Sequence, residues 1–248
     1  MKGRTVLYTG AAGGLGLETT ILLMRRGATV VAIDKDAAKI AQLEAAAASA
    51  GDGRLVVSTA DLSDLAGFRA ELDRLLDQVG RFDVVINNAA IYPSRPFEEF
   101  TVEDHQLVQR VNVDAGIVAV QAALAGMRER GWGRIINISS ITISGGWANL
   151  SPYVASKGAL IGLTRAWARE FGPYGITVNA IAPGAFPTDA EKIHPDPAGY
   201  NRLVLDAQAI KRRGTADDIA AAIAFFAADE ASFITGQTLH VNGGWVMA

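Results

Sequence analysis

The chain has 248 residues, of which 50% are hydrophobic and 20% are charged, with a formal net charge of −3 and no cysteine. A charge so close to zero argues against binding of nucleic acid or an anionic membrane through bulk charge. The absence of cysteine excludes disulfides, thiolate nucleophiles and Cys-ligated metals. The three histidines, His105, His194 and His240, lie too far apart for a local metal motif, so no metal site is expected. The longest apolar run, residues 219–228, is shorter than the roughly 20 residues that span a bilayer, and no signal peptide is visible, which favours a cytoplasmic protein.

Short β-rich runs alternate with longer segments of helical spacing, as in a parallel sheet covered by helices on both faces. The expected strands are residues 5–9, 29–33, 55–59, 84–87, 134–138, 177–182 and 238–241. No Pro- or Ser-rich linker and no internal repeat divides the chain. We therefore expect one α/β domain over residues 1–248, a doubly wound parallel sheet of seven strands.

Helix signals lie between these strands. Two sequences, Thr101-x-x-Asp104 and Thr215-x-x-Asp218, are typical of capping boxes at helix starts. Residues 153–171 and 203–211 are expected to be helical, and the alanines at 45–48 to form the tail of a helix.

One connection breaks the alternation. The segment 184–213 carries several prolines and is long for a simple link between the sixth and seventh strands. Segments of this kind are usually lids or binding loops, which predicts a substrate lid at about 185–213, with an irregular surface excursion as the alternative.

A glycine-rich turn, residues 9–16 with the sequence TGAAGGLG, joins the first strand to the first helix. Glycines allow the backbone to approach a pyrophosphate, and a helix N-terminus offers free N–H groups, although such a turn can also need glycine for steric reasons alone. The second strand ends at Asp34, 18 residues after Gly16, where a carboxylate can bind ribose hydroxyls and repel a 2′-phosphate. Lys35 could soften that repulsion. The pattern favours NAD over NADP.

Tyr153 and Lys157 are four residues apart in an expected helix, so their side chains share one face. A tyrosine is almost wholly protonated at neutral pH, and a neighbouring ammonium favours the phenolate. The pair therefore predicts a group that removes a proton from an alcohol or donates one to a ketone. A half-buried tyrosine beside a solvated lysine is the bland alternative.

The chain resembles the short-chain dehydrogenases/reductases over essentially its whole length. The resemblance rests on the turn at 9–16, Asn87-Asn88-Ala89-Ala90, Asn112, Ile138-Ser139-Ser140, Tyr153-Val154-Ala155-Ser156-Lys157, Asn179, Pro183-Gly184 and Thr188. It implies a Rossmann-like fold, transfer of a hydride between NAD(H) and a substrate carbon, and a homotetramer built through the long helices after Thr101 and Tyr153 and the C-terminal strand.

The resemblance also implies roles for individual residues. Ser140, rather than its neighbour Ser139, would donate a hydrogen bond to the reacting oxygen, and Tyr153 would exchange the proton. Lys157 would lower the pKa of Tyr153 and bind the nicotinamide ribose, while Asn112 would hold a water that links Lys157 to solvent.

The expected cofactor contacts follow from the same motifs and are Gly10, Gly14, Leu15, Gly16, Asp34, Asp61, Leu62, Asn88, Tyr153, Lys157, Pro183, Gly184 and Thr188. Two positions depart from the family pattern. Ala90 replaces a glycine close to Asn88, so Asn88 is expected to sit slightly differently. Asn242 replaces an aspartate that many members carry, which removes one charge near the C-terminus.

The substrate is expected beyond the carboxyl ends of the strands, under the lid. Its candidate contacts are Tyr92, Thr142, Trp147, Asn149, Phe186, His194 and Gln208. This mixture of aromatic and polar groups predicts a small polar, sugar-like or aryl-alkyl secondary alcohol. The alternatives are an NADPH-dependent carbonyl or 3-oxoacyl reductase, and a protein that binds NAD without turnover.

Overall fold

The computed structural model describes residues 1–51 and 53–247 of the chain. Seven parallel strands form one sheet in the order β3-β2-β1-β4-β5-β6-β7. The strands are β1 (Thr5–Thr9), β2 (Thr29–Asp34), β3 (Arg54–Thr59), β4 (Val84–Asn87), β5 (Gly133–Ile138), β6 (Ile176–Pro183) and β7 (Thr238–Val241). Each expected strand is present, with ends that differ by no more than one residue. The expected doubly wound α/β fold is confirmed.

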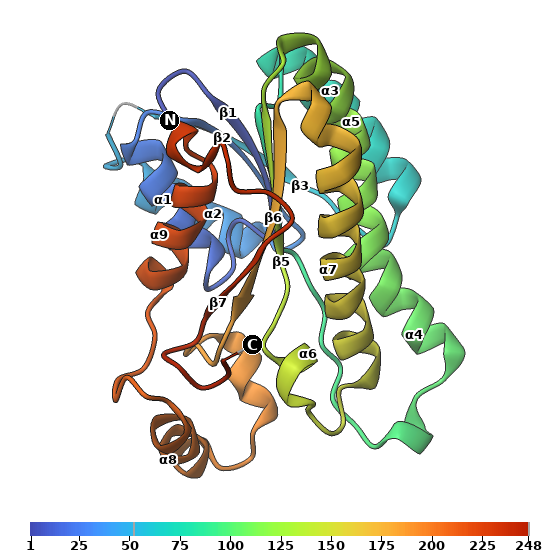
Figure 1. Cartoon of the computed structure of the whole chain (residues 1–248), viewed down its shortest axis with the longest axis vertical. Helices are drawn as coiled ribbons and strands as arrows, with labels where there is room; N and C mark the ends of the chain where they lie inside the picture. Colours follow the sequence, from blue (N-terminus) through green and yellow to red (C-terminus); the bar gives the residue numbers. More distant parts are fainter. Residues whose placement is uncertain (52, 248) are drawn as a thin grey trace.

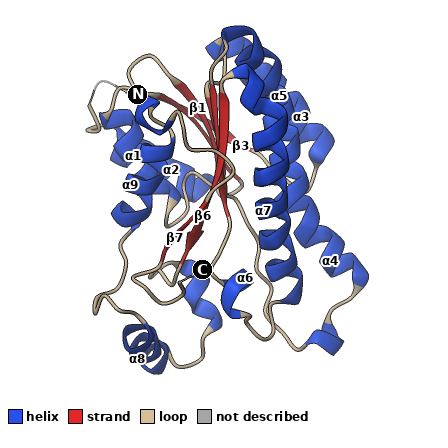
Figure 2. Ribbon diagram, in the orientation of Figure 1, coloured by secondary structure: helices blue, strands red, loops and turns tan. Residues whose placement is uncertain are grey.

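Helices cover both faces of this sheet (Figure 1, Figure 2). One face carries α1 (Gly16–Arg25), α2 (Ala37–Ala47) and α9 (Ala216–Phe226), and the other carries α3 (Leu65–Val79), α5 (Ala115–Arg130) and α7 (Ser151–Phe171). Successive side chains of a strand point to opposite faces. Val6 and Tyr8 of β1 therefore pack into one apolar core with α1 and α9, whereas Leu7 packs into the other with α3 and α5.

The helix that begins after Thr101 is interrupted by a wider turn. The capping box is formed, because the Thr101 hydroxyl accepts a hydrogen bond from Asp104 N–H at 3.1 Å and the Asp104 carboxylate accepts one from Thr101 N–H at 2.9 Å. α4 (Val102–Gln109) then continues through a π-helical turn (Arg110–Asp114) into α5. Such turns often lie at functional sites, and this one contains Asn112.

The segment 184–213 contains a 3-10 helix, η4 (Asp189–Ile193), and α8 (Pro197–Ala207). The bounds expected for this helix, residues 203–211, are wrong, because α8 begins six residues earlier and ends four residues earlier. Pro197 is tolerated in a first helical turn, and the Asp196 carboxylate caps it by accepting a hydrogen bond from Gly199 N–H at 2.9 Å, so the helix starts earlier. It ends before Gln208, whose backbone is extended.

The remaining short helices connect the main elements. They are α6 (Thr142–Gly145) and 3-10 turns at Phe97–Glu99, Gly172–Tyr174 and Asp229–Ala231. α7 starts two residues earlier than expected, because Pro152 fits its first turn. Among the described residues, no helix combines the length and apolar character needed to cross a membrane.

Candidate active site

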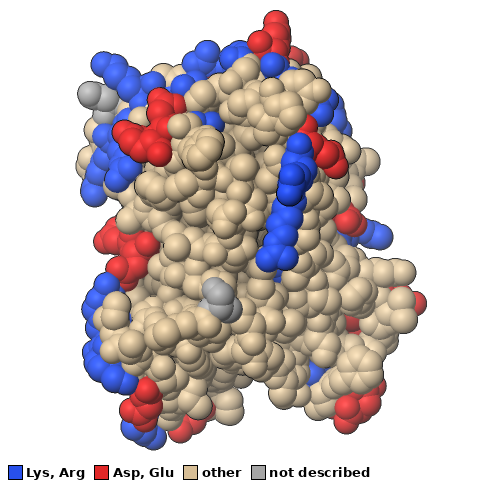
Figure 3. All heavy atoms as spheres, in the orientation of Figure 1, with Lys and Arg blue, Asp and Glu red and all other residues tan. Residues whose placement is uncertain are grey.

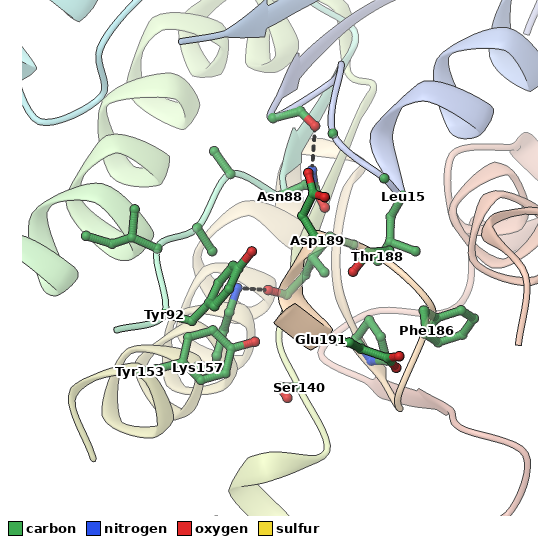
Figure 4. Close-up of a pocket in the computed structure, with 18 of the residues that line it drawn as sticks. Leu15, Asn88, Tyr92, Ser140, Tyr153, Lys157, Phe186, Thr188, Asp189 and Glu191 are labelled. Carbon is green, nitrogen blue, oxygen red and sulfur yellow. Dashed lines mark hydrogen bonds between the residues drawn. The ribbon is translucent and has the colours of Figure 1, made fainter. Parts of the chain in front are cut away.

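A cavity of about 570 Å³ lies at the carboxyl ends of the strands. Its walls come from the β1–α1 turn, the ends of β2, β4, β5 and β6, the N-terminal part of α7, and the lid segment, by which we mean residues 185–213. The strand order reverses between β1 and β4, where the sheets of doubly wound proteins bind their ligands. Figure 4 shows Tyr153, Lys157 and Ser140 on one side of the cavity and Leu15 and Thr188 on another.

The glycine-rich turn is held tightly against the loop after β4. Gly10 has a φ of +66°, and a Cβ there would lie 2.8 Å from the Asn88 amide nitrogen. Asn88 Nδ2 donates a hydrogen bond to the Gly10 carbonyl oxygen at 2.9 Å (Figure 4) and another to the Thr9 carbonyl oxygen at 3.1 Å. A Cβ on Gly14 would lie 2.7 Å from Thr188 Cγ2. The turn therefore leaves no room for side chains at Gly10 and Gly14, and its backbone fits a bound pyrophosphate.

Asp34 lies at the end of β2 on the same cavity. Its carboxylate accepts hydrogen bonds from Ala12 N–H at 3.3 Å and from Asp36 N–H at 3.2 Å, which fix its orientation. Asp61 and Leu62 line the wall beside it. An acceptor held at the end of the second strand fits the hydroxyls of an adenosine ribose.

At the other end of the cavity lie Ser140, Tyr153 and Lys157. The Lys157 ammonium donates a hydrogen bond to the Ile138 carbonyl at 2.7 Å and lies 5.4 Å from the centre of the Tyr153 ring. Ser139 and Ser140 differ in their bonding. The Ser139 hydroxyl donates to the Lys157 carbonyl at 2.8 Å, whereas the Ser140 oxygen accepts from Thr142 N–H at 3.2 Å and its hydroxyl interacts with the Tyr153 hydroxyl in the cavity.

Burial dominates the protonation of this pair. It raises the pKa of Tyr153 to about 12, with a hydrogen bond from Ser140 acting in the opposite direction, and it lowers the pKa of Lys157 to about 7. The expectation that Lys157 lowers the tyrosine pKa is therefore wrong for the protein without cofactor. Desolvation disfavours the charged form of each group, the phenolate and the ammonium.

Asn112 lies behind the cavity wall. Its side-chain oxygen accepts from Ile91 N–H at 2.8 Å, and its amide nitrogen donates to the Ile91 carbonyl and the Ser156 hydroxyl, each at 3.0 Å. Ser156 in turn donates to the Tyr153 carbonyl at 2.7 Å. The Asn112 side chain thus joins the loop after β4 to α7, and its expected role in holding a water stays a prediction.

Most of the other residues expected at the site line the cavity. Of the cofactor set, every residue except Gly16 does so. A Cβ on Gly16 would overlap the Gly10 carbonyl oxygen, so this glycine permits the close packing of turn and helix. Of the substrate set, the five residues that line the cavity are Tyr92, Thr142, Trp147, Phe186 and His194.

Asn149 and Gln208 were expected to contact the substrate, and this expectation is wrong because neither residue lines the cavity. Asn149 is exposed in the turn before α7 with a φ of 64°, and its carbonyl accepts a hydrogen bond from Arg95 N–H at 3.0 Å. Gln208 is 3% exposed and lines a second, smaller cavity with His240 and Gly243. It does so because α8 ends before it and the chain turns toward the C-terminal segment, where Ile210 N–H donates to the Gly243 carbonyl at 2.9 Å.

Several lining residues were not expected from the sequence, among them Lys39, Asp189, Glu191 and Ile193. Lys39 looks like an ordinary surface position on α2, and the other three lie on the irregular lid segment. No spacing in the sequence marks any of them, because they meet only through contacts between distant segments.

Comparisons with known proteins agree with this geometry. A family model described as "Enoyl-(Acyl carrier protein) reductase" matches residues 10–246. Levodione reductase of Leifsonia aquatica is 34% identical over 253 aligned residues, which cover 97% of this chain and 93% of the relative. The chain belongs to the short-chain dehydrogenase/reductase family. Another relative of this dehydrogenase, the 3-oxoacyl-(acyl-carrier-protein) reductase FabG of Vibrio harveyi, is 33% identical, and the match covers 100% of this chain and 99% of the relative.

Solved structures give the same result. One from Beutenbergia cavernae, described as an NAD(P)-dependent gluconate 5-dehydrogenase with NADP bound at low occupancy, has a TM-score of 0.92 and 34% identity. The match covers 99% of this chain and 97% of that one. This dehydrogenase is an NAD(P)-dependent oxidoreductase that acts on CH–OH or ketone groups.

Proposed function

We propose that this enzyme interconverts a secondary alcohol and a ketone with NAD as its cofactor. The observation that carries the proposal is one cavity with Ser140, Tyr153 and Lys157 at one end and Asp34 at the other. The chain would act as one dehydrogenase domain, with the lid segment over the substrate and a small polar, sugar-like or aryl-alkyl alcohol beneath it. The cytoplasmic location expected from the sequence stays a prediction.

The reacting oxygen would lie between Ser140 and Tyr153. A bound nicotinamide would supply the hydride acceptor for oxidation of the alcohol and the hydride donor for reduction of the ketone. Ser140 donates a hydrogen bond to the oxygen on which charge develops. Tyr153, which is neutral because burial raises its pKa to about 12, donates its proton to a ketone oxygen directly. In the oxidative direction its phenolate must be stabilised by Lys157 in the protonated form.

Several groups would hold the dinucleotide. The backbone of the glycine-rich turn and Leu15, at the start of α1, would bind the pyrophosphate, and Asp34 would bind the adenosine ribose, with Asp61 and Leu62 beside the adenine. Asn88, Pro183, Gly184 and Thr188 would line the path to the nicotinamide. Asn112 would act as a positioning residue for Tyr153 through Ser156. Asp34 supports NAD over NADP, although one relative binds NADP. The experiment is a comparison of turnover with the two cofactors.

The homotetramer remains part of the proposal. The face over β7 and α7 is largely uncharged apart from a basic stripe over α7, and most other charged side chains lie at its margins (Figure 3). Leu239 of β7 is 39% exposed, and Phe233, just before β7, is fully exposed. Light scattering on the purified protein would measure the mass, which should fall in a Leu239→Arg variant.

A turnover screen tests the reaction. Nicotinamide reduction would be followed with NAD and with NADP against polyols, aldoses, cyclic alcohols and aryl-alkyl carbinols. Tyr153→Phe should lower turnover at least about a hundredfold while NAD binding changes by only a few-fold. Tyr174→Phe, at an exposed tyrosine beyond α7, is the matched control and should keep wild-type turnover. Activity that survives in Tyr153→Phe would overturn the assignment of the proton donor.

A further inference from the structure

Tyr92 packs edge-on against Tyr153, with ring centres 6.2 Å apart, and other aromatic side chains line the same cavity. Tyr92, Trp147, Phe186 and Tyr200 line it, and His194 stacks on Tyr200 with ring centres 3.6 Å apart and planes 16° apart. Aromatic faces attract apolar rings and cations, and they offer nothing to an anion.

The cations that line the cavity are engaged elsewhere. Lys39 pairs with Asp189 at 2.8 Å, and Lys35 lies beside Asp34 at the ribose end. Lys157 is buried, with its pKa lowered to about 7. None of these lining cations is therefore free to receive a substrate carboxylate or phosphate beside the reacting groups.

Glu191 brings a carboxylate to this end. It lies on η4, and Figure 4 shows it on the lid, across the cavity from Tyr153. Its Oε1 atom is paired with Arg213, which also donates to the Asn201 side chain at 3.1 Å, and both members of the pair are only about one-fifth exposed. Glu191 lines the cavity and Arg213 does not. The pair thus presents the Glu191 carboxylate, and not the Arg213 guanidinium, to the cavity.

We propose that Glu191 selects the substrate by accepting a hydrogen bond from a hydroxyl or ammonium group placed away from the reacting carbon. The same carboxylate excludes alcohols that carry a carboxylate or phosphate there, because two negative charges in a poorly solvated cavity repel strongly. Arg213 and Asn201 hold Glu191 in place. The inference rests on the proposed function, since it takes Tyr153 and Ser140 as the site of the reacting oxygen.

Three secondary alcohols on the same ring test this. They are cyclohexane-1,4-diol, trans-4-aminocyclohexanol and 4-hydroxycyclohexanecarboxylate, each measured with NAD as kcat/KM. We expect wild-type enzyme to prefer the diol and the amine over the carboxylate by about tenfold or more. Glu191→Gln keeps the shape and removes the charge, so it should shrink this preference about tenfold, mainly through KM. Glu129→Gln, at an exposed position near the end of α5, removes the same charge and should leave the preference unchanged.

The readouts separate the two proposals. Affinity for NADH, measured by its fluorescence, must stay near wild type in Glu191→Gln, which shows that the cavity is intact. If the alcohols turn over and Glu191→Gln leaves their order unchanged, the Glu191 assignment is overturned and the reaction stands. If none of the alcohols turns over, their binding to the enzyme–NADH complex is measured instead. Tighter binding of the diol and the amine than of the carboxylate, with this difference lost in Glu191→Gln, supports the assignment. Any other order of affinity, or no binding, overturns it. Missing turnover counts against the proposed reaction alone.

Discussion

The Lys39 ammonium lies 2.8 Å from the Asp189 carboxylate, although 150 residues separate the two in the chain. Lys39 belongs to α2 on the nucleotide side of the cavity, and Asp189 belongs to η4 on the lid segment. Asp189 also pairs with Lys192, its neighbour on η4, at 2.7 Å. The two ammonium groups, Lys192 first, lower the pKa of Asp189 to about 2. One carboxylate therefore joins the lid to the opposite wall of the cavity.

Removing that link should speed the loss of dinucleotide. We expect Lys39→Ala to raise the dissociation rate of NADH about two- to fivefold, because partly exposed ion pairs contribute little, and the effect should shrink with salt. Lys192→Ala removes an equal charge from the same carboxylate but leaves the link across the cavity. Stopped-flow fluorescence measures both rates. Equal effects of the two variants would contradict a role for the link.

The glycine-rich turn offers a comparison between adjacent positions. A methyl group on Gly14 would lie 2.7 Å from Thr188 Cγ2 and 2.9 Å from Thr188 Cβ, whereas one on Gly13 would meet nothing closer than 3.5 Å. Gly14→Ala should therefore displace the start of the lid segment and weaken NAD binding on the order of tenfold, while Gly13→Ala has a much smaller effect. Calorimetric titration with NAD measures both. A stronger effect at Gly13 would show that the cofactor approaches that position instead.

Asp34 should set the choice between the two dinucleotides. Asp34→Ala removes the acceptor for the ribose hydroxyls and the charge that repels a 2′-phosphate, so the ratio of NAD to NADP affinity should fall about tenfold. Asp36→Asn is the control, because Asp36 lies two residues further on and its side-chain oxygen caps α2, which asparagine can also do. An unchanged ratio of NAD to NADP affinity in Asp34→Ala would show that Asp34 does not determine the choice of cofactor.

Local patterns were enough to predict the sheet and the cofactor half of the site. Each strand is a short β-rich run bounded by turn residues, so its position can be predicted from the local sequence alone. The turn at 9–16 and Asp34 stand at strand ends, and the carboxyl ends of parallel strands meet at one edge of the sheet. The Tyr153 and Lys157 pair needed only helical spacing.

The lid half of the site could not be predicted in the same way. Glu191 reaches the cavity because Arg213, 22 residues away, holds it, and Gln208 misses the cavity because α8 ends one residue before it. The direction of the Tyr153 pKa was also missed. Helical spacing places Lys157 near the tyrosine, but the burial that shifts both pKa values depends on the whole fold around them.

Lys157 should make the stability of the protein depend on pH. Its pKa is lowered by burial from the ordinary 10.5 to about 7, so between these values the unfolded state binds more protons than the folded state. Stability therefore rises with pH across this window, by up to about 1.4 kcal/mol per pH unit, and is lost as the pH falls toward 7. Tyr153 acts in the opposite direction only above about pH 10, because its pKa is raised from 10.0 to about 12. Denaturant unfolding between about pH 7.5 and 9.5 isolates the lysine.

Lys157→Met should flatten this dependence and abolish turnover together, because methionine fills a similar volume without a charge to desolvate. The variant loses the hydrogen bond to the Ile138 carbonyl, which offsets part of its gain at neutral pH but does not vary with pH. Lys192→Met, at a lysine whose side chain is 79% exposed, should keep the wild-type slope. A Lys157→Met variant with the wild-type slope would show that the buried lysine does not titrate in this window.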